Sequence, residues 1–122
     1  MKPGDEIPAV RVTPDKYLTI RYAGASGDFN PIHIDDDFAR EVGLPGKILH
    51  GLWTMAQVAR AQGDPLSLRS LSVQFRGIGV PEREIVITST PVGDGVVEVE
   101  AVQGEARLVR RGRAVLGPPP AS

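Results

Sequence analysis

The chain has 122 residues, no cysteine and a formal net charge of −1 at pH 7. This length is typical of a single domain, so we expect one domain over residues 1–117 and a disordered, proline-rich tail over residues 118–122. Acidic and basic residues are spread along the chain, which excludes the one-sided basic surface of a nucleic-acid-binding protein. The absence of cysteine excludes disulfides and thiolate-bound metals.

Membrane association is not expected either. The first ten residues have no apolar run of signal-peptide length, and no segment approaches the roughly 18 apolar residues of a membrane span. We therefore expect a cytoplasmic protein. A monomer of this size buries only about two-thirds of the surface that its unfolded chain exposes. Because little apolar material is left for both a core and a closed pocket, we expect an oligomer with pockets at subunit boundaries.

Short elements are predicted for the first part of the chain. Residues 7–12 are typical of a short strand, and residues 19–27 predict a short helix with Thr19 as its N-cap and a glycine at its end. The helix cannot continue through Asn30, because a residue that precedes proline is driven out of the α region.

A second short helix is expected within residues 35–46. Three consecutive acidic residues occupy its first turn, where they favour a solvated helix start, and Gly43 and Pro45 are expected to stop it.

Residues 51–63 predict a helix of another kind, with apolar side chains on both sides. Leu52 and Ala56 lie on one side, and Trp53 and Val58 lie on the other. A helix that is apolar most of the way round is expected to be buried.

From residue 68 the chain has the alternation of β-strands. Leu71, Val73 and Phe75 share one face, and the pattern then changes parity at residues 77–79 (Gly-Ile-Gly), which predicts a bulge there. Three more strands joined by hairpin turns are expected at residues 84–92, 96–103 and 106–116.

This order of elements predicts the fold class. Glu98 and Glu100 alternate with apolar neighbours, so one face of the sheet is expected to face water. Only the sheet can cover the single apolar helix, so it must wrap that helix. We therefore expect an α+β protein with a single hot-dog fold, in which an antiparallel sheet wraps one long buried helix. Such folds usually pair edge to edge as dimers.

The candidate chemistry begins with Asp28 and His33. They are five residues apart and would lie on different faces of a helix, but the bend forced at Asn30-Pro31 allows the carboxylate and the imidazole to converge on one point. A histidine has the side-chain pKa best suited to proton transfer near neutrality, and a nearby carboxylate can be its partner around a water.

His50 and Gly51 open the apolar helix. The first N–H groups of a helix have no partner within it, and the helix dipole adds positive potential there. Such a helix start can hold the oxygen of a developing enolate. A carboxylate, an imidazole and an oxyanion donor together indicate proton chemistry next to a carbonyl.

Other interpretations of these residues remain open. Asp28 could be a turn-forming residue and His33 a structural histidine. Asp28, His33 and His50 could also hold a metal on ligand type alone. An EF-hand beginning at Asp28 is excluded, because its sixth residue is His33 where glycine is needed and its twelfth is Ala39 where glutamate is needed.

The same region resembles a known family. The stretch YAGASGDFNPIH (residues 22–33), followed by FAREVGLPGKILHGLWTM (residues 38–55), is similar to the signature of the MaoC-like dehydratases, the (R)-specific enoyl-CoA hydratases known as hydratase 2. LSVQFRGIGVP (residues 71–81) resembles the strand that follows in this family and in (3R)-hydroxyacyl-ACP dehydratase subunits. The likeness covers most of the chain.

The resemblance implies a hot-dog dimer that adds water reversibly across a trans-2-enoyl thioester. Asp28 and His33 match the catalytic pair of the family, which would activate one water and move the protons at the hydroxyl and at Cα. The main-chain N–H of Gly51 matches the group that polarises the thioester carbonyl.

The resemblance also implies supporting roles. Asn30 would hold the shape of the loop, Ser26 would be structural, and His50 would position its neighbours. No metal and no other cofactor is implied, because the thioester itself acidifies Cα. The expected partners are an acyl-CoA or acyl-ACP substrate and a second copy of the chain, with a heterodimer as the alternative.

Two rival functions can be weighed against the sequence. Hot-dog thioesterases commonly carry a catalytic carboxylate on the central helix, and residues 52–62 contain neither Asp nor Glu. A non-catalytic subunit or binding module would be expected to have lost Asp28 or His33, and this chain keeps both.

The sequence leaves the carrier and the acyl chain length undetermined. The phosphates of CoA would favour basic residues at the pocket mouth, for which Arg69, Arg76 and Arg83 are candidates. Trp53 and Met55 are expected in the core, although either could border an acyl channel.

Overall fold

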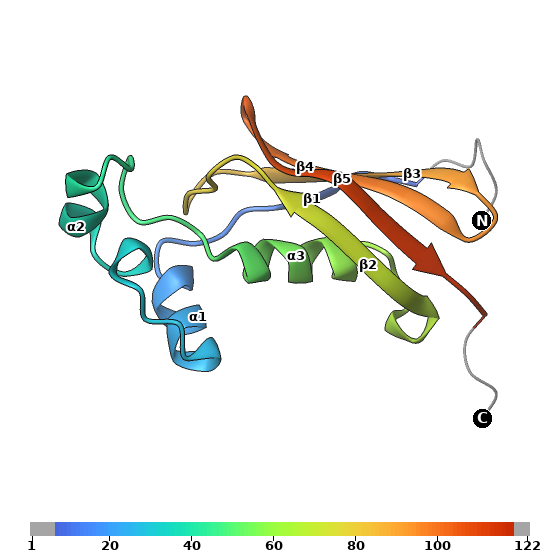
Figure 1. Cartoon of the computed structure of the whole chain (residues 1–122), viewed down its shortest axis with the longest axis horizontal. Coiled ribbons are helices and arrows are strands. Elements are labelled where there is room, and N and C mark those ends of the chain that lie inside the picture. The colour runs from blue at the N-terminus through green and yellow to red at the C-terminus, as the bar shows by residue number, and fades with distance from the viewer. Residues whose placement is uncertain (1–6, 119–122) are drawn as a thin grey trace.

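A single antiparallel sheet lies across one helix in the computed structural model, which describes residues 7–118 (Figure 1). The elements in chain order are β1 (Val10–Val12), α1 (Leu18–Ser26), the 3-10 turn η1 (Pro31–His33), α2 (Asp36–Glu41), α3 (Gly51–Arg60), the 3-10 turn η2 (Pro65–Ser67), β2 (Leu68–Phe75), β3 (Ile85–Gly93), β4 (Val96–Gln103) and β5 (Ala106–Leu116). The predicted order is confirmed. The predicted tail lies outside the described residues, apart from Pro118.

Helix α1 ends as predicted but begins differently. Gly27 follows it in the left-handed conformation, with φ at 79°, and its N–H donates to the carbonyl of Ala23. The prediction of Thr19 as N-cap is wrong, because the helix begins at Leu18 and Tyr17 occupies the N-cap position. Thr19 is buried instead, which shows that tertiary packing overrides its capping preference here.

Helix α2 is a short, capped element. The carboxylate of Asp35 accepts hydrogen bonds from the N–H groups of Asp37 and Phe38, at 3.0 and 3.2 Å. Gly43 and Pro45 lie beyond its end, as predicted.

Helix α3 buries only one of its apolar sides in the single chain. Trp53 and Val58 are buried against the sheet, whereas Leu52 is 65% exposed and Ala56 is also exposed. The prediction that the helix is buried most of the way round is therefore wrong for one chain. One sheet can cover only one face of a helix, so the face of Leu52 stays open.

The core lies between α3 and the three central strands. Its inward-facing strand residues are Ile85 and Ile87 on β3, Val97, Val99 and Ala101 on β4, and Leu108, Val109 and Ala114 on β5. Each fully buried Ile, Leu or Val side chain contributes about 1.5–3 kcal/mol. Glu98 and Glu100 face outward, which confirms the predicted alternation.

The sheet has the strand order β1-β3-β4-β5-β2, and all neighbours are antiparallel. Two-residue turns at 94–95 and 104–105 form the predicted hairpins. Strand β2 pairs only with β5, so within residues 7–118 its other edge is free.

The bulge predicted at residues 77–79 is wrong, because β2 ends at Phe75 and the irregularities of pairing lie elsewhere in the sheet. Between Val109 and Gly112, β5 has two residues where β4 has only Glu100, and Arg111 adopts a φ of 52°. Gly77 has another reason to be glycine, since a Cβ there would lie 2.8 Å from the carbonyl oxygen of Arg107. The change of parity therefore marks a close approach of two backbones.

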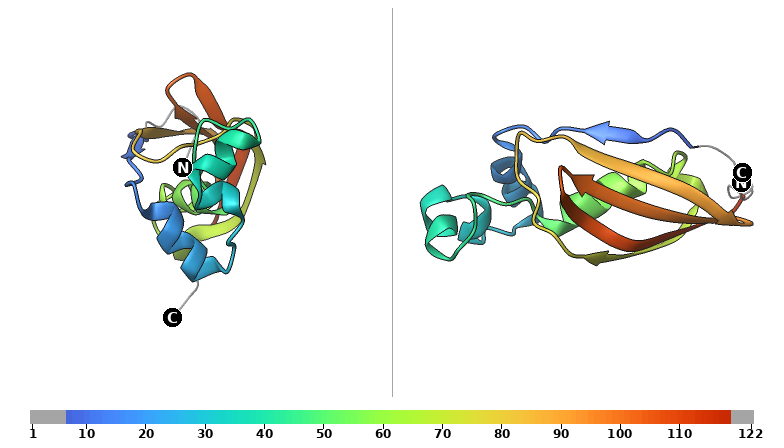
Figure 2. Two further views of the ribbon diagram at one scale, coloured as in Figure 1. Left: turned by 90° about the vertical axis from the view of Figure 1, so that its left-hand side faces the viewer. Right: turned by 90° about the horizontal axis from the view of Figure 1, so that it is seen from above.

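Helices α1 and α2 gather beyond one end of the sheet, next to the N-terminal end of α3 (Figures 1 and 2). This arrangement brings the loop that follows α1 to the start of α3, so the two parts of the predicted site meet there.

Candidate active site

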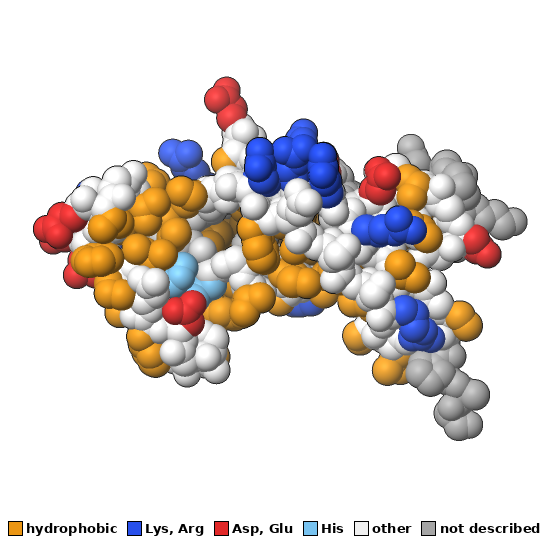
Figure 3. Space-filling model, viewed as in Figure 1, with side chains coloured by type: hydrophobic (Ala, Val, Ile, Leu, Met, Phe, Trp, Pro, Cys, Tyr) orange, Lys and Arg blue, Asp and Glu red, His pale blue; other side chains and the backbone are white. Residues whose placement is uncertain are grey.

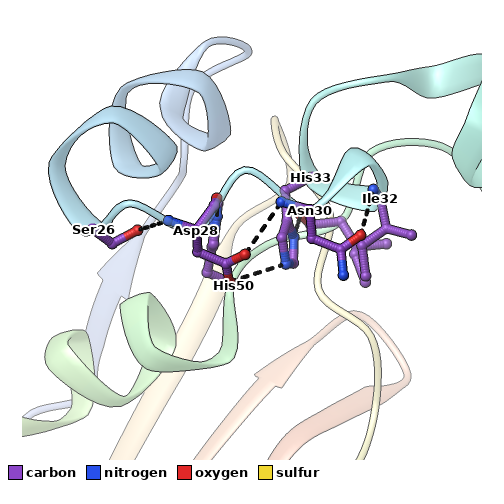
Figure 4. A network of polar contacts seen from close by, with 7 residues as sticks. Ser26, Asp28, Asn30, Ile32, His33 and His50 are labelled. Atoms are coloured by element: carbon purple, nitrogen blue, oxygen red, sulfur yellow. Dashed lines mark hydrogen bonds and ion pairs between the residues drawn. The ribbon is translucent and has the colours of Figure 1, made fainter.

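Consecutive turns bend the loop between α1 and η1 (Figure 4). The Oγ atom of Ser26 accepts a hydrogen bond of 3.2 Å from the N–H of Asp28. Asp28 Oδ1 in turn accepts from the N–H of Asn30, and Asn30 Oδ1 accepts from the N–H of Ile32, each at 3.2 Å. Ser, Asp and Asn form turns by this two-residue pattern. The bend directs His33 back towards Asp28.

The imidazole of His33 is held by the main chain. Its Nδ1 lies 2.8 Å from the carbonyl oxygen of Ile48, which can only accept a hydrogen bond. Nδ1 therefore carries the proton, and the lone pair of the neutral ring lies on Nε2. This Nε2 is 3.8 Å from Asp28 Oδ2. That distance is too long for a direct hydrogen bond and suits a small molecule bound by both groups.

The two groups differ in their access to solvent. The side chain of His33 is 10% exposed, whereas that of Asp28 is 52% exposed. His33 therefore forms the buried side of the pair, and Asp28 forms an open side from which a substrate can approach. Figure 3 shows histidine and acidic atoms together on an open part of the surface, bordered by apolar side chains.

His50 contacts this pair on its buried side. It is buried, its ring stacks on that of His33 with centroids 3.8 Å apart, and the ring of Tyr22 lies 4.8 Å from it on another side. Its Nε2 donates a hydrogen bond of 3.1 Å to the carbonyl oxygen of Asp28. His50 thus contacts both Asp28 and His33, and it links them to the start of α3.

Gly51 is the first residue of α3, at the position where a helix N–H has no partner within the helix. The structure records no hydrogen bond from this N–H to any residue in the range 7–118. A Cβ at this position would lie 3.3 Å from Cε1 of Phe75. A pocket of about 130 Å³ adjoins Gly51 and is lined mainly by apolar groups, among them Leu49, Phe75 and Leu108.

The predicted site residues therefore occupy one place. Asp28, His33 and His50 have potential ligand atoms within 4.8 Å of one another, which satisfies the distance requirement of the metal alternative. However, Nε2 of His50 is already used on a main-chain carbonyl, and Nδ1 of His33 is used on another. Ser26 and Asn30 make their hydrogen bonds within the loop.

Several parts of the site had no signal in the sequence. The carbonyl of Ile48 orients His33, but a carbonyl group is present at every residue. Tyr22 and Phe75 reach the site from separate elements, and their contacts depend on the fold. Of the three candidate phosphate-binding arginines, Arg69 donates to the carbonyls of Leu66 and Pro118 near the start of β2.

Comparison with known proteins agrees with this arrangement. The sheet and its single helix form a hot-dog fold, and the structure superposes with a TM-score of 0.84 on a MaoC-like dehydratase from Phytophthora capsici, at 29% identity over 96% of this chain and 42% of that one. The MaoC-like domain family matches residues 2–111. The chain therefore belongs to the MaoC-like domain family.

Two relatives illustrate the range of proteins in which the domain occurs. A fatty acid synthase beta subunit from Cochliobolus carbonum is 32% identical over 103 residues, which is 78% of this chain and 5% of that protein. The peroxisomal enoyl-CoA hydratase 2 of Arabidopsis thaliana is 38% identical over 71 residues, 53% of this chain and 22% of that protein. The chain thus spans only a small part of these relatives. Within residues 7–118, no helix has the length and apolar character needed to cross a bilayer.

Proposed function

We propose that this domain catalyses the reversible hydration of trans-2-enoyl thioesters to (3R)-3-hydroxyacyl thioesters. The observation that carries the proposal is the position of His33 Nε2, which lies 3.8 Å from Asp28 Oδ2 at the start of α3. The gap suits one water that donates a hydrogen bond to each of the two groups. Membership of the MaoC-like family and the likeness to an enoyl-CoA hydratase 2 support this choice of reaction.

In the hydration direction, Asp28 and His33 hold the water and take one of its protons as its oxygen bonds to Cβ of the substrate. The π electrons move to Cα and on to the carbonyl oxygen, which becomes an enolate. The pair then returns a proton to Cα, so that one water is added and both side chains recover their starting states. Dehydration follows the same steps in reverse.

The Gly51 N–H stabilises the enolate. It lies at the first position of a ten-residue helix, where the dipole adds positive potential. The thioester itself acidifies Cα, so the proposed steps require no metal and no redox cofactor. Asn30 and Ser26 hold the shape of the loop. His50 is a positioning residue, because it contacts the pair from its buried side.

The protein is proposed to act as a homodimer. Strand β2 has eight residues and a free edge within the described chain, and such an edge readily pairs with another strand. Beside it, the exposed face of α3 presents Leu52, which a second copy would cover. A heterodimer with a related subunit is the alternative, and light scattering of the purified chain distinguishes the two.

A thioesterase is the second function to test. The described structure argues against it, because the ten residues of α3 include no carboxylate and the first acidic residue after it is Asp64. A hydrolase at this site would release free thiol, which a thiol reagent detects during the same assay.

The experiment is the loss of enoyl-thioester absorbance when the protein is added to crotonyl-CoA, with chiral analysis of the product. We expect wild-type protein to form the (R)-3-hydroxy product, and Asp28→Asn and His33→Ala each to lose about 10²–10⁴-fold in kcat. Circular dichroism controls for folding. If folded wild-type protein is inert with both crotonyl-CoA and longer enoyl thioesters, as homodimer and after addition of a related subunit, the proposal is wrong.

A further inference from the structure

Four basic side chains from four separate segments line one pocket of about 430 Å³. Lys16 precedes α1, Arg40 lies on α2, Lys47 lies before α3, and Arg83 lies between β2 and β3. No short sequence pattern brings these residues together, so the fold itself concentrates positive charge at this place. The volume lies within the range of small-molecule sites, which is about 300–1,000 Å³.

The walls of this basic pocket are fixed by hydrogen bonds. The side-chain amide of the buried Gln103 bonds with both main-chain polar groups of Val80 and with the carbonyl of Arg83, all at 2.8 to 2.9 Å. The N–H of Glu82 donates to the carbonyl of Pro14 and so ties the Arg83 loop to the segment that carries Lys16. The backbone that frames the pocket is therefore held in place by the fold, and the basic side chains extend from it, with Lys47 half-buried and the other three exposed.

The charges in the pocket are not balanced internally. Four cations face the carboxylates of Asp36 and Glu82. One oxygen of the Asp36 carboxylate already accepts a hydrogen bond of 2.8 Å from the main-chain N–H of Lys47. Among residues 7–118, the side chains of Lys16, Lys47 and Arg83 form no ion pair. These unpaired cations are available to an anionic ligand.

The basic pocket is next to the candidate active site. Ile78 lines both this pocket and the small pocket beside Gly51. Lys47 and Gly51 are four residues apart in the chain and are separated by at most about 14 Å. An extended pantetheine arm can bridge such a span, with its thioester at Gly51 and its phosphates among the cations.

We propose that the basic pocket of Lys16, Arg40, Lys47 and Arg83 binds the phosphate groups of coenzyme A, which makes free acyl-CoA the substrate of this domain. The inference rests on the proposed hydratase function. Charged groups bind phosphates through short, charge-assisted hydrogen bonds, and Arg is suited to bidentate contacts. Val80 and Pro81 are half-buried walls of the same pocket and offer apolar surface to the adenine ring.

A carrier protein fits this place less well. A carrier protein brings only the single phosphate of its phosphopantetheine arm, whereas coenzyme A brings three phosphate groups for these four cations. A second group of arginines lines another pocket, of about 540 Å³, on the outer face of the sheet, where Arg107, Arg110, Arg111 and Arg113 lie among Glu98 and Glu100. That face is on the side of the sheet opposite α3, and it therefore provides matched control residues.

The test compares kcat/KM for crotonyl-CoA with kcat/KM for crotonyl-pantetheine, which carries the same thioester without phosphates. We expect wild-type protein to prefer the CoA thioester, and Lys47→Ala/Arg83→Ala to lower that preference about tenfold or more. The control is Arg110→Ala/Arg113→Ala, which removes equal charge from the outer face and should keep the wild-type preference. Crotonyl-ACP is assayed in parallel.

Three outcomes would overturn the inference. Wild-type protein could show no preference for CoA over pantetheine, the Lys47/Arg83 variant could lose both activities in equal measure, or crotonyl-ACP could be the better substrate and be weakened by the same variant. If no thioester is hydrated, the hydratase proposal fails by itself. Calorimetric binding of CoA to wild-type protein and to the two double variants then still decides whether the pocket binds its phosphates.

Discussion

The carbonyl oxygen of Ile48 and Nδ1 of His33 are 2.8 Å apart, and this contact determines which nitrogen of the ring faces Asp28. The N–H of Ile48 donates to the carbonyl of Ile32, so the two segments hold each other in register. A main-chain group therefore orients the imidazole through the hydrogen bond at Nδ1. The remaining orientation comes from the stacked ring of His50.

Replacement of His50 tests this supporting role. His50→Phe keeps a stacked ring but removes the donor to the carbonyl of Asp28, so we expect the free energy of unfolding to fall by about 1–3 kcal/mol. We also expect a lower kcat with little change in KM, because the pair is misplaced while the pocket is intact. Urea unfolding and steady-state kinetics measure the two effects.

The matched control for His50 is Tyr22→Phe. Tyr22 also contacts the His50 ring, but its hydroxyl makes no hydrogen bond to residues in the described part of the chain. We expect its unfolding midpoint and kcat to stay near wild type. Equal unfolding midpoints for His50→Phe and wild type would contradict the importance of the hydrogen bond to Asp28.

Local patterns in the sequence predicted much of the fold. Alternation identified β3, β4 and β5, and the glycine-containing turns identified the hairpins, because these features depend on neighbouring residues. The Asn30-Pro31 bend predicted that Asp28 and His33 converge, since the restriction before proline is also local. The family resemblance covered the same residues.

Features that depend on distant parts of the chain were not predictable. The sequence of α3 shows two apolar sides, but only the placement of the sheet decides that Val58 is buried and Leu52 exposed. The bulge appears at Arg111, where the register of β5 shifts against both β4 and β2, and the sequence of one strand does not show its register with two neighbours. The basic pocket unites four segments, so spacing along the chain gave no sign of it beyond naming Arg83 as one candidate.

The contact between Gly51 and Phe75 predicts a specific effect of a small substitution. Gly51→Ala would place its Cβ 3.3 Å from the Phe75 ring, which is 49% exposed and can move away. Because alanine also has the higher helix propensity, we expect the free energy of unfolding to change by less than about 1 kcal/mol. The displaced ring should change the pocket beside Gly51 and raise KM severalfold.

A double-mutant cycle separates this steric effect from a loss of the Gly51 N–H, which alanine retains. Phe75→Leu removes the ring, so Gly51→Ala should cost less in that background than in wild type. Strictly additive effects on kcat/KM would show that the two residues do not act through their contact.

Replacement of Thr19 is expected to stabilise the protein, in contrast to His50→Phe. Its hydroxyl oxygen is buried, and it has no hydrogen-bond partner among the described residues. Thr19→Val keeps the shape of the side chain and removes the unsatisfied group, so we expect a gain of about 1 kcal/mol in the free energy of unfolding. Thr13→Val, at an exposed position, is the control and should change stability little. A loss of stability in Thr19→Val would mean that the hydroxyl is satisfied in solution.

The ionisation of Asp36, which lines the basic pocket, is expected to make the free energy of unfolding depend on pH. The hydrogen bond from the N–H of Lys47 lowers the pKa of its carboxyl group, and the charges of Lys47, Arg40 and Lys16 lower it further. Because the pKa is lower in the folded state, the carboxylate stabilises the protein above the unfolded pKa of about 4. That contribution is lost as the pH falls through the folded-state pKa.

We therefore expect Asp36→Asn to be less stable than wild type at pH 7 and the difference to shrink as the pH is lowered below about 4. Urea unfolding at a series of pH values measures this difference. Asp37→Asn is the control, because its carboxylate is 94% exposed and, within residues 7–118, makes only a long contact of 3.6 Å with Arg40. An Asp36→Asn difference that is the same at pH 3 and pH 7 would show that the charge of Asp36 is not what stabilises this part of the fold.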